Sequence, residues 1–534
     1  MTQAAPAPSE AEIIAALTAE NRALRELVED LRRSVSWFTR HVFGEKSEKL
    51  VLPEGQTQED LLGLLGQEPP APPAPETETI TYERRKRKKS RDDAVTGEGL
   101  RFDDTVPMET ILLPLSPEAQ AIPEDRREVV GEKVTYRLAQ RPTSHVILKY
   151  IRSVVRDRED RPEDGKKVKL FTAPAPANVL ERSCADVSFL AGMLVDKFTY
   201  HLPLYRQHQR LVHNGVTLAR STLTVQAGQA IDLLAPISDA QYKALLLNRV
   251  LAMDETPIKA GRKAPGKMRR GQLWPIYGEK DEVVFLYTDS RKHSHVRKIL
   301  GDRFKGVLLS DGYEGYPRYA EKMSGVTLAN CWAHARRPFE GALKAEPEAA
   351  AKALKLIGLL YAHEERIREK ELSGPEKLAY RTDHSLPVMK AFWEWCEGQC
   401  RRHDLVPTNP LSKALKYAMD RKGPLQVFLS DPDVAIDTNH LERMAARPIA
   451  MGRKNWLFCS TEVGARRVAV IQSLLVTCRL QGVDPYVYLV DVLQRVGRHP
   501  AKDVIDLTPR IWKEKFGHDP LKSDLDRVRS GTLD

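Results

Sequence analysis

The sequence predicts an α/β core, in which a mixed sheet carries helices on both faces and is interrupted by a large helical insertion. Short apolar runs typical of strands recur between residues 248 and 330, with a helical pattern among them. A charged, alanine-rich helical stretch follows from about 335 to 430. Three strands, a helix, and then two strands that are each followed by a helix indicate a mixed sheet with helices packed on it.

Each element of this core has a local signal. Apolar and aromatic runs predict the strands, and Asp254 and Asp311 lie just after the first and the fourth of them. The expected strands are 249–253, 273–277, 283–287, 306–309 and 326–329, and the expected helix among them is 293–300. We therefore place the core at 245–340 and 431–460, with the helical insertion at 341–430.

The end of the chain is expected to contain two helices within 462–497, separated by a turn at 482–485 (GVDP). The charged residues from about 500 onward are expected to form a loosely ordered tail. Residues 461–534 are thus predicted as C-terminal helices and a tail.

Residues 1–50 are expected to mediate dimerisation. A seven-residue repeat places four residues at position a and four at position d, and the single polar Asn21 at position a is typical of a two-stranded parallel coiled coil. The alternative is an amphipathic helix packed on its own domain. The repeat consists of Ile14, Asn21, Val28 and Val35 at a, and Leu17, Leu24, Leu31 and Phe38 at d.

Residues 51–99 read as a linker that is first proline-rich and then basic. Prolines between 67 and 79 favour an extended chain. Six consecutive bases cannot pack in a core, so they are either solvated or bound to phosphate. We expect DNA contact there, through Arg84, Arg85, Lys86, Arg87, Lys88 and Lys89.

Two small modules are expected between this linker and the core. Alternating apolar residues predict a strand-rich module at 100–160, which contains no cysteine. At 180–240, a short helix that ends at an Asn-Gly pair is followed by a second helix. This order matches a helix-turn-helix domain, although an ordinary helical hairpin fits as well. The residues expected to contact DNA from this second module are Arg206, Arg220, Ser221 and Thr222.

Composition narrows the class of protein. The 534 residues suffice for roughly three or four domains, and the net charge of +10 favours a polyanionic partner such as nucleic acid. No run of about 18 apolar residues occurs, so we expect no membrane span and no membrane partner. Six cysteines in so long a chain do not make a disulfide framework, which indicates a cytoplasmic protein.

Three carboxylates are the candidate catalytic residues and metal ligands: Asp254, Asp311 and Glu442. Ligands gather at strand ends in open sheets, and converging carboxylates repel one another unless a cation lies between them. Oxygen ligands suit Mg²⁺ or Mn²⁺, and two such ions are expected, as in phosphodiester chemistry. Glu442 alone among bases could instead be a surface ion pair. If the strand continues past Asp254, Glu255 points to the opposite side, so it is not counted among the candidate ligands.

Several short stretches carry a resemblance to a known family. The chain resembles DDE transposases of the bacterial insertion-sequence family IS66, specifically the large transposase subunit. Each stretch is modest alone, but they follow one another in the right order over most of the chain. They are 43–50 (FGEKSEKL), 201–207 (HLPLYRQ), 252–257 (AMDETP), 310–313 (SDGY), 331–337 (CWAHARR), 439–443 (NHLER) and 452–458 (GRKNWLF).

The resemblance implies a ribonuclease-H-like catalytic core that cleaves transposon-end DNA and transfers the freed 3′-hydroxyl to target DNA. It also implies that Asp254, Asp311 and Glu442 form the acid triad, and that His334 lies close to it. Small accessory proteins of the same element are a further expected partner. The family usually carries a cysteine-rich zinc module at the place that residues 100–160 occupy, but this chain has no cysteine there, so no zinc is expected. The resemblance implies that this segment is a DNA-binding module, which is expected to contact DNA without metal.

Further DNA contacts are expected around the triad, because arginine forks match phosphate geometry. Cys331 and His334 have metal-ligand spacing, although packing is the simpler explanation, and burial is likewise the simpler explanation for Trp332 and Trp456. The expected DNA-binding residues near the triad are His334, Arg336, Arg337, Asn439, Arg443, Arg447, Arg453, Lys454 and Asn455.

Three alternatives remain at this point. A ribonuclease-H-like nuclease would use the same acids with water and transfer nothing. A DNA-binding regulator would keep the helical modules while its acids serve only structure. An inactive transposase would keep the fold and lose the reaction.

Overall fold

The computed structural model describes residues 100–141, 144–158, 169–264, 266–302, 304–443, 447–456 and 459–529. The chain divides into two units, Met1–Arg87 and Lys88–Asp534, and every described residue belongs to the second. The expected coiled coil at 1–50 and the linker at 51–99, with its six bases, lie outside the described residues. None of the described helices combines the length and the apolar character that a membrane crossing requires.

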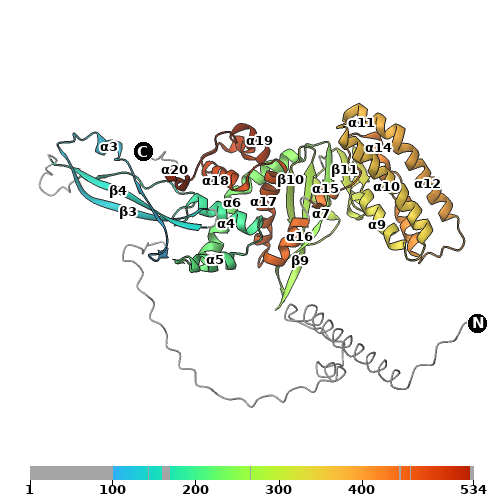
Figure 1. Cartoon of the computed structure of the whole chain (residues 1–534), viewed down its shortest axis with the longest axis horizontal. Helices are drawn as coiled ribbons and strands as arrows, with labels where there is room; N and C mark the ends of the chain where they lie inside the picture. The colour runs from blue at the N-terminus through green and yellow to red at the C-terminus, as the bar shows by residue number, and fades with distance from the viewer. Residues whose placement is uncertain are drawn as a thin grey trace, which may run out of the picture. The chain divides into compact units, whose positions relative to one another are not determined.

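A strand-rich module begins the described part (Figure 1). Its elements are β1 (Arg101–Phe102), β2 (Met108–Leu112), α3 (Pro117–Gln120), β3 (Arg127–Arg141), β4 (Ser144–Asp157) and β5 (Phe171–Thr172). β3 and β4 form a long antiparallel hairpin. β2 runs parallel to β4, and β5 pairs with β4 in the antiparallel direction. Ile147 is buried like its neighbours Val146 and Leu148, so β4 is covered on both faces rather than on one.

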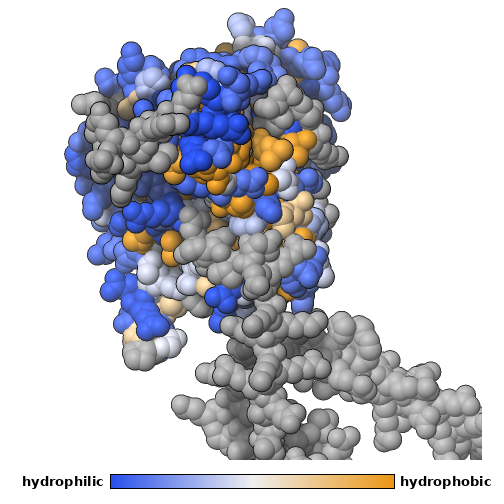
Figure 2. Space-filling view, turned by 90° about the vertical axis from the view of Figure 1, so that its left-hand side faces the viewer, coloured by the Kyte–Doolittle hydropathy of each residue, from blue (hydrophilic) through white to orange (hydrophobic). Residues whose placement is uncertain are grey.

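Hydrophobic side chains also reach the surface of this module. Leu112, Val129 and Leu170 are all more than half exposed. Figure 2 shows hydrophobic residues grouped among hydrophilic ones on the face that it presents. A groove of about 540 Å³ lies beside Tyr150 and is lined largely by aliphatic side chains and prolines. The surface of the module is therefore partly apolar.

Helices follow the module. They are α4 (Val187–Phe198), α5 (Leu204–His213) and α6 (Arg220–Leu245), with the short strand β6 (Val216–Thr217) between the last two. The helix–turn–helix arrangement of α5 and α6 matches the expected order, with Gly215 in the left-handed region between them. The second helix, however, runs beyond the expected boundary at 240, because its buried face continues through Ile237 and Gln241 to Leu245.

The central sheet has the order β10-β9-β7-β11-β12, and β8 pairs with β9 beside this path. Its elements are β7 (Val250–Met253), β8 (Thr256–Ala264), β9 (Lys267–Gly278), β10 (Val283–Thr288), α7 (Ser294–Leu300), β11 (Gly306–Ser310), α8 (Gly315–Ala320) and β12 (Val326–Asn330). β11 runs parallel to β7 and β12, whereas β9 is antiparallel to β7 and β10. The predicted mixed sheet is confirmed.

Helices cover both faces of this sheet. Leu251, Trp274 and Leu308 pack with α7 and α8 in one cluster of buried residues. Ala252, Phe285 and Leu309 belong to the other cluster, which contains α6 and the C-terminal helices. Alternate residues of β7 and of β11 thus enter different cores, which explains why these strands are apolar throughout.

The expected strand count was wrong by one, because β8 was missed. Its outer half and the facing part of β9 hold exposed bases and glycines instead of alternating apolar residues, so no period of two marks them. β9 is correspondingly longer than the predicted 273–277. The remaining strands and α7 lie where the sequence placed them, within two residues at each end.

Between the sheet and Glu442 the chain is helical, as expected. The helices are α9 (Trp332–Ala342), α10 (Pro347–Glu369), α11 (Gly374–Tyr380), α12 (Leu386–Cys400), α13 (Pro410–Met419) and α14 (Val427–Ser430), with one π-helical turn at Arg381–Ser385. Trp332 is fully buried, which confirms the packing interpretation for that residue. Two short helices follow, α15 (Asn439–Leu441) and α16 (Arg447–Trp456).

The C-terminal residues do not form the loose tail that was expected. After α17 (Glu462–Leu480) and α18 (Pro485–Arg495), a 3-10 helix at Ala501–Leu507 leads to α19 (Pro509–Lys515) and α20 (Asp524–Arg529). Trp512 and Leu525 are buried, and the buried carboxylate of Asp491 accepts hydrogen bonds from the Trp512 indole and the Leu521 amide. Apolar anchors widely spaced among charges hold this segment in place.

Candidate active site

Asp254 and Asp311 lie side by side because of the register between β7 and β11. Ala252 is paired with Leu309 in this parallel ladder, and each aspartate lies two residues beyond its strand's member of the pair. The Asp254 amide still donates to Pro275 O of β9, at 3.3 Å, so the first aspartate stays attached to the sheet. The expectation that the two acids converge at neighbouring strand ends agrees with this geometry.

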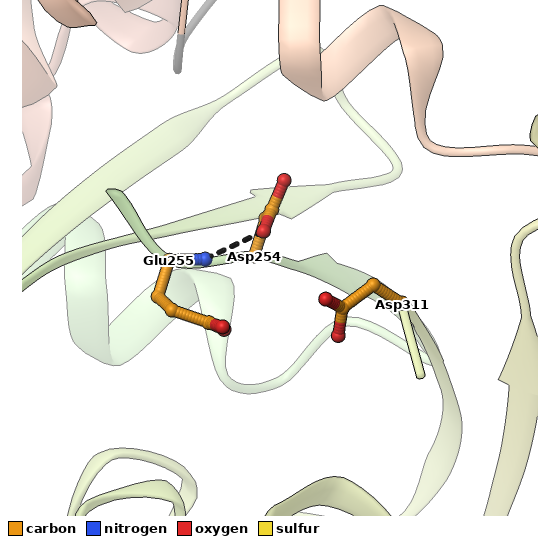
Figure 3. Close-up of side chains that lie close together, drawn as sticks. All are labelled: Asp254, Glu255 and Asp311. Atoms are coloured by element: carbon orange, nitrogen blue, oxygen red, sulfur yellow. Dashed lines mark hydrogen bonds between the residues drawn. The ribbon is translucent and has the colours of Figure 1, made fainter. Parts of the chain in front are cut away.

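A third carboxylate completes the cluster, and it is Glu255. One ligand atom each of Asp254, Glu255 and Asp311 lies within 4.8 Å of the others, and Figure 3 shows the three side chains gathered together. The expectation that Glu255 points away was wrong. Residues 254 and 255 lie between β7 and β8 outside both strands, so the alternation of a continuous strand does not apply to them.

Glu255 is held by two partners that the sequence did not single out. Tyr316 donates its hydroxyl to Glu255 Oε2 at 2.8 Å, and Arg291 donates Nε to Oε1 at 2.6 Å. The Arg291 guanidinium also lies 3.9 Å from Asp311 Oδ2. Pro257, two residues after Glu255, was the available signal, since proline inside a strand marks an edge or a change of pairing.

The cluster carries more negative charge than its surroundings neutralise. Burial, together with Asp311, Glu255 and Glu442, raises the pKa of Asp254 from its usual 3.8 to about 7, although a hydrogen bond from the Glu255 amide opposes the rise. Burial and Asp311 also raise the pKa of Glu255, against Tyr316 and Arg291. A divalent cation held by these oxygens would remove the repulsion, and carboxylates are the ligands that Mg²⁺ and Mn²⁺ prefer.

Glu442 lies near this cluster but is not part of it. It follows α15, and Arg337 Nη2 of α9 donates to both of its carboxylate oxygens, at 3.1 and 2.9 Å. It is close enough to raise the pKa of Asp254. The structure therefore places all three predicted acids in one region, with Glu442 occupied by an arginine.

Comparison with known proteins identifies the family. A family model described as "Transposase IS66 family" matches residues 182–467, which is more than half of the chain, and a second, "IS66 C-terminal element", matches 473–510. The chain belongs to the IS66 transposase family. The resemblance inferred from the short motifs is thereby confirmed, and membership implies the use of a divalent metal and DNA as substrate.

The chain is also similar to three uncharacterized proteins of Sinorhizobium fredii. It is 31% identical to y4hP over 412 residues, which are 73% of this chain and 72% of that protein. It is 32% identical to y4jD over 363 residues, covering 64% of this chain and 69% of the relative. The third, y4qI, is 29% identical over 358 residues.

The other residues expected to contact DNA in this IS66 transposase lie on α9 or between residues 439 and 455. Arg336 is exposed and pairs with Glu340, while the Asn439 amide donates to Asp437. Arg336, Arg337 and Asn439 all line one pocket of about 350 Å³. Arg443 is exposed, and Arg447, Arg453, Lys454 and Asn455 belong to α16, but the side chains of these last four lie outside the described part.

His334 lies among charged groups, as the family resemblance implied. Burial and Arg337 lower its pKa, whereas Asp311, Glu442 and Asp437 act in the opposite direction. Its Nδ1 is buried and has no hydrogen-bond partner among the described residues. The neighbouring Cys331 is buried, and its sulfur accepts hydrogen bonds from the amide and the hydroxyl of Thr438, which agrees with a packing role.

The residues expected to contact DNA from the helical module lie apart from the acids in the chain. Arg206 of α5 and Arg220 and Ser221 of α6 are exposed, and Thr222 is half-buried. The Arg220 guanidinium stacks over the Tyr205 ring at 5.7 Å. All four lie on α5 or α6, and their contact with DNA stays a prediction.

Asp254→Asn is expected to stabilise the metal-free protein at pH 8. Below pH 4 the Asp254 carboxyl is protonated in the folded and the unfolded chain, and between about 4 and 7 only the folded chain keeps the proton. The stability that the folded chain gains by binding this proton is therefore lost as pH rises through about 7. At about 1.4 kcal/mol per pKa unit, the effect is a few kcal/mol at most.

Thermal melting in EDTA at pH 5.5 and pH 8 measures this effect, with Asp302→Asn as a control because that aspartate is paired with Arg297 at the surface. The wild type should lose more stability than Asp254→Asn between the two pH values. Added Mg²⁺ should then raise the melting temperature of the wild type and not of Asp254→Asn. Equal melting curves for the wild type and Asp254→Asn at both pH values, in EDTA and in Mg²⁺, would contradict the expected charge repulsion.

Proposed function

We propose that this chain is a DDE transposase that cleaves DNA at transposon ends and joins the freed 3′-hydroxyl to target DNA. The observation that carries the proposal is the β7–β11 register, which brings Asp254 and Asp311 together at the carboxyl ends of two parallel strands. Membership of the IS66 transposase family supplies the reaction class. The central sheet and its helices would form the ribonuclease-H-like core, with residues 341–430 as the insertion.

The acids present fit a site for divalent metal. Asp254, Asp311 and Glu442 would hold two Mg²⁺ or Mn²⁺ ions, which supply activation of the attacking hydroxyl and stabilisation of the leaving oxygen. Glu255 adds a fourth carboxylate, already oriented by Tyr316 and Arg291. The raised pKa of Asp254 reflects burial beside other carboxylates, and a bound cation would lower this pKa again.

Arg337 connects DNA binding to the third acid. Its guanidinium is half exposed and now holds Glu442. A DNA phosphate is an equally suitable partner for an arginine fork. Transfer of Arg337 to phosphate would leave Glu442 free to join Asp254 and Asp311, with Arg336 and Asn439 beside it in the same pocket.

The remaining modules would position the DNA. The helices around Arg206 and Arg220, together with the strand-rich module and the bases at 84–89, would hold transposon ends. The heptad repeat at 1–50 would join two or more copies, as two transposon ends require, and accessory proteins of the same element would assist. The reaction would take place in the bacterial cytoplasm, at the nucleoid, and without zinc.

A strand-transfer assay tests the proposal. The full chain is incubated with pre-cut transposon-end DNA and a target plasmid, with Mg²⁺ or with EDTA, and with the accessory proteins in a parallel series. We expect joined product in Mg²⁺ alone. Hydrolysis without joining would favour the nuclease alternative. DNA binding without any metal-dependent cleavage would favour the regulator or the inactive transposase.

A further inference from the structure

The hairpin formed by β8 and β9 has a strongly basic outer half, which we call the basic ribbon and define as residues 259–270 (KAGRKAPGKMRR). It holds six bases among twelve residues and no acid. All six side chains are exposed, and Figure 1 shows the end of β9 near this turn extending away from the rest of the sheet. The bases are Lys259, Arg262, Lys263, Lys267, Arg269 and Arg270.

These charges are almost entirely uncompensated. Arg269 pairs with Glu462 at 3.2 Å, and the other five bases make no ion pair with a carboxylate in the part of the chain that is described. Lys259 is directly opposite Arg270 in the antiparallel register. Like charges directly opposite each other destabilise a ladder, so this pair carries a cost that a bound anion would relieve.

We propose that the basic ribbon is an arm that binds duplex DNA through its phosphates. The proposal rests on the proposed function, because that function supplies DNA as the partner. A two-stranded ribbon has the dimensions of the major groove, and its bases can reach the phosphates on either side. Nothing in the sequence motifs of the family resemblance assigned these residues.

The composition of the ribbon selects among polyanions. Residues 259–270 contain no aromatic side chain, so they cannot stack on the unpaired bases of a single strand. Exposed aliphatic or aromatic anchors, which would bury themselves in a lipid interface, are missing too, since the one large apolar residue, Met268, is half-buried. Binding to duplex phosphates requires only positive charge, so the composition of the ribbon favours duplex DNA over a single strand or a lipid surface.

The root of the ribbon is fixed beside the acids. β8 begins at Thr256, directly after Glu255, and β9 continues into residues that pair with β7, where Ile276 is opposite Met253. Cys459 clamps the other edge, since its amide donates to Lys259 O and its carbonyl accepts from the Gly261 amide, both at 3.0 Å. DNA held by the ribbon would therefore be held at a set position relative to Asp254.

Arg270→Glu is the sharpest test, because its two expected effects have opposite signs. It replaces the repulsion with Lys259 by attraction, so the melting temperature should be equal or higher. It also replaces a phosphate contact by a repulsive charge, so duplex affinity at 0.1 M salt should fall about tenfold. The slope of log affinity against log salt should become shallower by about one to two. Fluorescence anisotropy with a labelled 40-base-pair duplex measures the affinity and its salt dependence, and thermal melting measures the stability.

Lys263→Glu, near the turn and opposite no residue of β9, is a second variant that leaves the ladder intact and should weaken binding similarly. The control is Lys352→Glu, an exposed base on α10 without an ion pair to the described residues, which should bind duplex as the wild type does. Wild-type affinity and slope in both ribbon variants would overturn the proposal, as would absence of duplex binding by the wild type. Failure of the proposed function is distinct: the wild type would then bind duplex but show no metal-dependent cleavage.

Discussion

Asp311→Asn is expected to reduce Mg²⁺-dependent strand cleavage by about 10²–10³-fold. Metal ligation stabilises the charge of the transition state by several kcal/mol, and each 1.4 kcal/mol is about tenfold in rate. Asparagine keeps the side-chain oxygen that accepts from the Tyr313 amide at 2.9 Å, so the loop after β11 should keep its shape. Single-turnover cleavage of labelled transposon-end DNA at saturating enzyme measures the loss.

Duplex affinity should remain at the wild-type value in Asp311→Asn, which separates a catalytic defect from a binding defect. Asp302→Asn, on the surface beside Arg297, should cleave normally. Cleavage by Asp311→Asn at more than a tenth of the wild-type rate would remove Asp311 from the metal site.

The same assay assigns the third acid. Glu442→Gln should lose about as much as Asp311→Asn. Glu255→Gln should lose only about tenfold, the lower end of the range for residues that orient ligands, since its amide can still accept one of the two hydrogen bonds from Tyr316 and Arg291. The reverse order of losses would make Glu255 the third acid.

Arg381→Met is expected to destabilise the helical block by about 3–5 kcal/mol. Arg381 is fully buried, and its guanidinium makes two hydrogen bonds to Glu364, at 2.8 and 2.7 Å. It also donates to the carbonyls of Phe428, Asp431 and Val434. Methionine would leave Glu364 buried without its partner and release the segment that leads toward Glu442.

Urea unfolding followed by tryptophan fluorescence measures this loss, since Trp332, Trp393 and Trp395 all lie buried in the block. Arg402→Met is the matched control, because that arginine pairs with Asp404 and Glu346 at the surface and should matter by about 1 kcal/mol or less. Equal unfolding midpoints for the two variants would show that Arg381 is not the anchor of the block.

Physical signals of different strength decided what could be predicted. Asp254 and Asp311 follow uninterrupted apolar runs, so both the strands and the strand-end location of the acids were readable. The direction of the Glu255 side chain was predicted wrongly because β7 ends at Met253, where its pairing with β9 ends. No local pattern in the sequence marks that end. β8 was missed because its outer residues are charged and exposed instead of alternately apolar. α20 was missed because only Leu525 and Val528 among its residues pack on the apolar cluster.

The position of α20 also sets an order of events during synthesis. The core between β2, β4 and their neighbours is completed by Leu525, and the Tyr150 hydroxyl donates to Asp524 at 2.8 Å, across 374 positions in the chain. The ribosome adds roughly 5–20 residues per second, so this apolar sheet face waits many seconds for its cover. The strand-rich module is made early but can finish folding only when almost the whole chain has been translated.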